Sequence, residues 1–233
     1  MILRLIILVC LSLPSAIISN AQDCLDVINK MLLYSKADEI FNGIKWVYPK
    51  RFLGSPMLVE NYWPKADIFY NGTRYEKIFM NYDISKNDII IYNPEKSSAK
   101  YIVINKDKLQ GFSYRDTVSG RKHDFIYSEL PGVSGKALYE TITTGIVTLY
   151  IKPVKQVVMR SSDKVQGQYS EYFLYFLKIG ERCTGFQSKS QLTSLLGNHA
   201  TEVQRFIRKN KLKINTTHPR DIIAVITFYE GLK

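Results

Sequence analysis

Apolar and polar side chains alternate through residues 51–187, as expected for strands that bury one face. The clearest case is 146–152, where Val147, Leu149 and Ile151 share one side of the predicted strand. Most other stretches of this kind are also short and end at Gly, Pro, Asn or Asp, the residues typical of turns. The predicted strands are 66–70, 73–82, 87–92, 100–104, 111–115, 123–128, 137–141, 146–152, 155–160, 168–179 and 182–187.

The turns between these strands indicate how they connect. Asn71-Gly72 predicts a tight hairpin, because both residues tolerate positive φ. Short strands joined by short turns predict an antiparallel β-meander domain over residues 51–187, either barrel-like or folded as a sandwich. With the helical tail described next, the chain is assigned to the mainly β, α+β class.

Residues 188–233 change to helical spacing. Ser188 and Gln191 have the spacing of a capping box, Gly197 is a stop signal, and Pro219 opens a later helix. We therefore expect about three C-terminal helices packed on the sheet. Their apolar positions are Leu192, Leu195, Leu196, Val203, Phe206, Ile207, Ile222, Ile223, Val225, Ile226 and Tyr229.

Residues 22–50 carry weaker helical patterns and predict a short N-terminal helical arm. The first pattern is Leu25, Ile28, Leu32 and Leu33, and the second is Ile40, Ile44 and Val47.

Residues 1–21 have the pattern of a signal peptide. Arg4 precedes an apolar run at 5–13, and the small residues of Ser19-Asn20-Ala21 predict cleavage before Gln22. The mature chain is then exported, periplasmic or extracellular, or peripheral to the outer membrane. It contains no second long apolar run, so no transmembrane helix is expected in it.

The composition favours a folded, basic protein. With 45% hydrophobic and 12% aromatic residues, the chain has enough apolar surface for a sizeable core. A formal charge of +11 favours anionic partners, either acidic lipid or polysaccharide, and an envelope protein is the other partner considered. Export argues against nucleic acid.

Two groups of short motifs stand out, one in the strand region and one in the helical tail. They are Gly54-Ser55-Pro56, Asn71-Gly72 with Tyr75, Tyr82-Asp83, Ser188-Lys189-Ser190, Leu195-Leu196, Glu202-Val203, Phe206-Ile207 and Asn210-Lys211-Leu212. In these motifs the chain resembles a group of exported bacterial β-rich proteins of unknown function. The resemblance implies export and a β-meander with a helical tail, and it carries no activity or site residue.

No catalytic or metal-binding motif occurs in the sequence. It contains no His-Glu-x-x-His and no Gly-x-Ser-x-Gly, and its three histidines are far apart. We interpret His123 as a solvated turn residue and expect neither metal nor cofactor. Cys24 and Cys183 are candidates for a disulfide in an oxidising compartment, and two unpaired thiols are the alternative.

The predicted strand 168–179 is the candidate binding surface, through Tyr169, Glu171, Phe173 and Tyr175. Aromatic side chains on a strand suit a ligand surface, although such a strand is more often part of a core. The favoured function is a non-enzymatic exported envelope protein that binds through an aromatic β-surface and a basic surface. The alternatives are an envelope glycan or peptide hydrolase and a lipid-carrying β-barrel.

Overall fold

The computed structural model describes residues 39–49, 52–93, 100–145, 147–159 and 166–232. The chain divides into two compact units, Met1–Asn42 and Gly43–Lys233, and the second contains all the strands and helices described below. The expected signal peptide at 1–21 and most of the expected helical arm lie outside the described residues.

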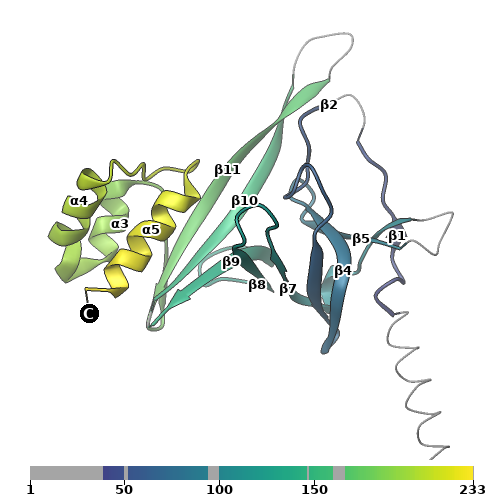
Figure 1. The fold of residues 1–233 in the computed structure, drawn as a ribbon, viewed down its shortest axis with the longest axis horizontal. Helices are drawn as coiled ribbons and strands as arrows, with labels where there is room; N and C mark the ends of the chain where they lie inside the picture. Colours follow the sequence, from purple (N-terminus) through teal and green to yellow (C-terminus); the bar gives the residue numbers. More distant parts are fainter. Residues whose placement is uncertain (1–38, 50–51, 94–99, 146, 160–165, 233) are drawn as a thin grey trace, which may run out of the picture. The chain divides into compact units, whose positions relative to one another are not determined.

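The second unit is a β-sheet followed by three helices, as the sequence predicts (Figure 1). The helices are α3 (Lys189–Leu195), α4 (Ala200–Lys209) and α5 (Pro219–Glu230). The strands are β1 (Ile44–Lys45), β2 (Phe52–Leu53), β3 (Lys65–Tyr70), β4 (Thr73–Asp83), β5 (Asp88–Tyr92), β6 (Tyr101–Val103), β7 (Leu109–Arg115), β8 (Lys122–Ser128), β9 (Ala137–Thr144), β10 (Val147–Met159), β11 (Gly167–Ile179) and β12 (Arg182–Phe186).

The strands form one mixed sheet. Its order is β1-β6-β5-β4-β3-β7-β8-β9-β10-β11-β12, and β2 runs parallel to β11. The expected meander is therefore interrupted, because β3 lies between β4 and β7. The sheet of described strands is also open, so the barrel-like arrangement is not found.

The predicted break between strands 146–152 and 155–160 is wrong. Residues 147–159 form the single strand β10, which pairs with β11 along its whole length. Pro153 lies between the two predicted strands, just past Ile151, where the pairing of β9 with β10 ends. Proline lacks an N–H group, and this is tolerated where a strand has a neighbour on one side only.

The described part of the expected N-terminal arm also differs from the prediction. Ile44 lies in β1, which pairs antiparallel with β6, so the helical spacing of Ile40, Ile44 and Val47 does not continue as a helix. The short strand forms because a sheet edge offers backbone partners, which periodicity in the segment alone cannot reveal.

One large hydrophobic core lies between β9–β12 and the three helices, which gather beside β10 and β11 (Figure 1). Val147, Leu149 and Ile151 all point into it, as the alternation predicts. From the helices, Val225 and Ile226 are fully buried against the same strands. Apolar burial therefore fixes the helices on one face of the sheet.

The helix ends follow the local signals of the sequence. Ser188 and Gln191 form both hydrogen bonds of a capping box at α3. Gly197 has φ +57° just after the end of α3, and Pro219 is the first residue of α5. Before α5, Thr216 O accepts a hydrogen bond of 2.7 Å from Phe173 N, which ties this segment to β11.

Candidate functional site

Four aromatic side chains lie side by side across the β4–β5–β6 part of the sheet. Tyr92 on β5 is the register partner of Tyr101 on β6, and Phe79 on β4 lies beside Tyr92. Just after β1, Trp46 N donates a hydrogen bond of 2.9 Å to Tyr101 O. We name Phe79, Tyr92, Tyr101 and Trp46 the aromatic row.

The rings of the aromatic row contact one another in sequence. The centroid distances are 6.4 Å for Phe79–Tyr92, 5.5 Å for Tyr92–Tyr101 and 6.2 Å for Tyr101–Trp46. These distances are within the range of favourable aromatic pairs. Phe79 and Tyr101 are 40% and 37% exposed, whereas Trp46 is only 8% exposed. The row is thus buried at Trp46 and open toward Phe79.

Trp63 forms one wall of a hollow at the open part of the aromatic row. Its ring lies 4.9 Å from that of Tyr101, and together with Phe79 and Tyr92 these residues line a hollow of about 360 Å³. This volume is in the range of small-molecule sites. Trp63 also packs against the cluster that holds Trp46, so this wall of the hollow is anchored in the core.

Lys65 supplies a positive charge at the Phe79 end of the row. Lys65 on β3 is the register partner of Phe79, and its Nζ lies 5.0 Å from the centre of the Phe79 ring. At this distance an ammonium group is attracted to the face of an aromatic ring. A ligand over Phe79 would therefore meet an aromatic face and a cation together.

A β-bulge sets the register that brings Lys65 to Phe79. The pairing of β3 and β4 shifts by one residue between Ala66 and Ile68, and Lys77 has φ +56° at this point. Without the shift, Lys65 would face Ile78. The left-handed conformation is unfavourable for lysine, so neighbouring contacts must hold it.

Asp67 provides these contacts. Its Oδ1 accepts a hydrogen bond of 3.1 Å from Lys77 N, and its Oδ2 accepts one of 2.7 Å from the Arg74 guanidinium. The bond from Arg74, supported by the bond from Lys77, lowers the pKa of the Asp67 carboxyl below its ordinary value, against a smaller opposing effect of burial. The ionised carboxylate therefore stabilises the bulge, and through it the position of Lys65.

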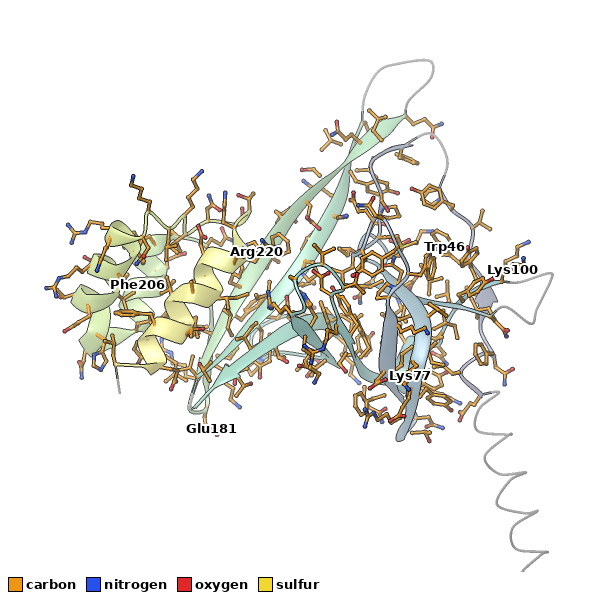
Figure 2. The ribbon with its side chains drawn as sticks, viewed as in Figure 1. Trp46, Lys77, Lys100, Glu181, Phe206 and Arg220 are labelled. Atoms are coloured by element: carbon orange, nitrogen blue, oxygen red, sulfur yellow. The ribbon has the colours of Figure 1, made fainter. Side chains whose placement is uncertain are left out.

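Gly43 determines how closely β1 approaches β6. A Cβ atom at this position would lie 2.1 Å from Val103 O and 2.6 Å from the side chain of Ile102. Only glycine fits there without displacing the backbone of a neighbouring strand. The approach of β1 in turn places Trp46 beside Tyr101. Figure 2 labels Trp46, Lys77 and Lys100 in this part of the sheet.

The residues proposed from sequence as the binding surface lie on β11, away from the aromatic row. Tyr175 is 1% exposed in the helix-side core, where its ring stacks on that of Phe186 at 5.5 Å. Phe173 packs against the same core. Burial raises the pKa of the Tyr175 hydroxyl. These two side chains thus belong to the core, the alternative considered for this strand.

The other two proposed residues contact the segment that contains β2. Tyr169 packs on Phe52, with ring centroids 5.7 Å apart. Glu171 Oε1 lies 3.7 Å from Lys155 Nζ. Lys155 is itself buried, and its Nζ donates hydrogen bonds to Ser55 O, Met57 O and Glu60 Oε1. Tyr169 is thus partly buried, whereas Glu171 stays exposed on this end of β11.

The structure leaves the expected disulfide as a prediction. Cys183 is half-buried on β12, and this burial raises the pKa of its thiol. Cys24 lies outside the described residues. Among the described residues, no group of three or more His, Cys, Asp or Glu side chains is arranged to hold a metal ion.

Comparisons with known proteins found no similar protein, so the functional argument depends on the geometry of the aromatic row. No family model, curated protein or solved structure matches the chain. Within the part of the chain that the structure describes, no helix is long and apolar enough to cross a bilayer.

Proposed function

We propose that the protein is an exported, non-enzymatic binding module of the cell envelope, and that the aromatic row with Lys65 binds an anionic polysaccharide. One observation carries the proposal: aromatic rings from three adjacent strands and Trp63 line an open hollow that has a lysine at its edge.

The shape and chemistry of the hollow suit a sugar ring. One face of a pyranose presents several C–H groups, which pack favourably on the electron-rich face of an aromatic ring. The row extends across β4, β5 and β6, so successive sugar units can contact successive rings. An elongated ligand uses this arrangement better than a compact one.

The charge of the chain favours an anionic glycan over a neutral one. Lys65 lies over Phe79, and the exposed Lys100 directly precedes Tyr101. The formal charge of +11 adds a long-range attraction to polyanions. The pattern of residues 1–21 and the resemblance to exported bacterial β-rich proteins support a location in the envelope, where acidic polysaccharides occur.

Tryptophan fluorescence tests this proposal directly. Trp46 and Trp63 are the two tryptophans of the chain, and both contact Tyr101. The mature protein is titrated with polygalacturonate and, as a matched neutral polymer, with fully methyl-esterified pectin. We expect polygalacturonate to change the emission and the esterified polymer to act more weakly.

Matched variants locate the binding surface. Phe79→Ala should weaken binding of polygalacturonate at least about fivefold, because it removes an aromatic contact and the ring beneath Lys65. Phe69→Ala is the control, because Phe69 is 42% exposed on the neighbouring strand β3 and does not line the hollow. Equal losses in the two variants would contradict the proposal.

A third titration separates polysaccharide from lipid. Vesicles of phosphatidylglycerol should change the fluorescence less than polygalacturonate at the same charge concentration. If only the vesicles act, and Phe79→Ala abolishes their effect, the row is a lipid site and the polysaccharide proposal is wrong. If neither polyanion acts, the row does not bind polyanions.

A further inference from the structure

A second hollow lies between the turn that joins β7 to β8 and the start of α5. Its volume is about 260 Å³. Figure 2 labels Arg220 at this end of α5. The hollow has a polar lining, unlike the aromatic one. Its residues are Asp116, Ser119, Arg121, His123, Arg220 and Ile223.

His123 is fixed beside this hollow and is not a solvated turn residue, contrary to our interpretation of the sequence. It lies in β8, and its side chain is only 17% exposed. Its Nδ1 lies 2.9 Å from Glu140 Oε1, and its ring stacks on Tyr114 with centroids 4.8 Å apart. Two contacts thus determine the orientation of the imidazole.

The carboxylates near the hollow already have donors. Glu140 accepts hydrogen bonds from Arg121 and His123 through the same oxygen. Asp116 accepts from Tyr62 Oη, Val118 N and Ser119 Oγ. The bonds from Val118 N and Ser119 Oγ lower the pKa of the Asp116 carboxyl. Both carboxylates are thus largely occupied within the protein.

Two other groups remain available to a ligand. Within the described residues, Arg220 has no carboxylate in ion-pair distance, and its guanidinium offers five N–H donors. A carboxylate oxygen can only accept, so His123 donates to Glu140 through Nδ1. In the tautomer with its proton on Nδ1, the Nε2 atom is a hydrogen-bond acceptor, and it has no partner among the described residues.

We propose that this hollow binds a small hydroxylated oxyanion. Arg220, supported by the remaining N–H groups of Arg121, receives the anionic group. His123 Nε2 accepts a hydrogen bond from a hydroxyl on the adjacent atom of the same ligand. The volume fits a ligand smaller than most drug-sized molecules. This site is independent of the aromatic row.

Glycolate and acetate form the matched pair of probes, because they differ only in the hydroxyl. The mature protein is labelled with ¹⁵N and titrated with each anion at constant ionic strength. The His123 imidazole and the backbone amides of 116–123 are followed by NMR. We expect glycolate to bind roughly threefold to tenfold more tightly than acetate, the effect of one net hydrogen bond.

Three variants assign the two contacts. Arg220→Gln, at an exposed position, should weaken both anions at least about tenfold. His123→Phe keeps the stacking on Tyr114 and should abolish the preference for glycolate. Arg205→Gln, on the exposed side of α4, is the charge-matched control and should change neither affinity.

The proposal is overturned if the wild type binds the two anions equally or not at all, or if Arg220→Gln binds them as the wild type does. A preference for glycolate that survives in His123→Phe overturns the assignment of the hydroxyl contact. Should His123→Phe not fold, the result with Arg220→Gln and the ratio of the two anions in the wild type still decide the proposal.

Discussion

The carboxylate of Asp67 accepts a hydrogen bond from the backbone N–H of Lys77, 3.1 Å away, at the residue where β4 bulges. This hydrogen bond also affects the position of Lys65, at the start of β3. The bulge shifts the register of β3 against β4, and the shift places Lys65 over the ring of Phe79. A single carboxylate thus links a backbone irregularity to the charge at the candidate site.

Replacement of Asp67 by alanine should destabilise the fold and alter the site. The variant loses the bonds from Lys77 N and Arg74, and we expect a decrease of about 1 to 2 kcal/mol in the free energy of unfolding. Urea denaturation measures it. Asp124→Ala is the control, because it removes a carboxylate whose ion pair with Lys122 is exposed and should cost less than about 1 kcal/mol.

The contribution of Asp67 should depend on pH in a defined direction. The pKa of its carboxyl is lower in the folded chain than its usual 3.8, so the ionised form favours folding. This stability is present above pH 3.8 and is lost as the pH falls through the lower, folded pKa. The difference in unfolding free energy between wild type and Asp67→Asn should therefore be largest near neutral pH and shrink in acid. A difference that grows on acidification would contradict the assignment.

Glycine at position 77 should stabilise the protein. Lys77 has φ +56°, which glycine adopts without strain, so Lys77→Gly should raise the free energy of unfolding by about 1 kcal/mol. Lys77→Val should lower it by at least as much, because a β-branched residue tolerates this conformation poorly. Thermal unfolding of the two variants, compared with the wild type, tests the pair. A stabilising valine would show that the bulge is not as described.

A methyl group at Gly43 should displace β1. Its Cβ would lie 2.1 Å from Val103 O, so Gly43→Ala should separate β1 from β6 and expose the indole of Trp46. We expect a red-shifted fluorescence emission and a loss of about 1 to 3 kcal/mol of stability, with the helix-side core intact. Gly120→Ala is a control for steric fit, since nothing lies within 4 Å of its Cβ position, although its positive φ carries its own cost.

Export predicts a defined mature terminus. Intact-mass measurement on protein recovered from the native cell should give the mass of residues 22–233. The same sample should appear in the periplasmic or extracellular fraction. Recovery of the chain with Met1 retained would contradict the signal-peptide interpretation and, with it, the envelope part of the proposed function.

Much of the fold follows from local sequence signals. The helix limits at Ser188, Gly197 and Pro219 are predictable, because caps act within a few residues. The strands with alternating residues are also predictable, because the alternation of apolar and polar side chains lies within a single strand. The insertion of β3 between β4 and β7, and the parallel pairing of β2 with β11, depend on contacts distant in sequence that no local pattern records.

The candidate site was harder to predict than the strands that carry it. Phe79, Tyr92 and Tyr101 all lie in or next to predicted strands, but only their relative register makes them a row. Counting back from the Asn71-Gly72 turn places Lys65 opposite Ile78. The bulge shifts the register by one residue, so that Lys65 lies opposite Phe79. The sequence gives no signal for this bulge, because lysine is not a residue typical of positive φ. By contrast, the aromatic residues of β11 are evident in the sequence, and two of them, Phe173 and Tyr175, pack in the helix-side core.

Beyond Ile151, one edge of β10 faces no strand among the described residues. Such an edge can serve as a template for strand addition by another copy of the chain, the usual first step of aggregation. Pro153 stands at the beginning of this open edge and removes a hydrogen-bond donor from it. This proline therefore helps to keep separate molecules from joining their sheets.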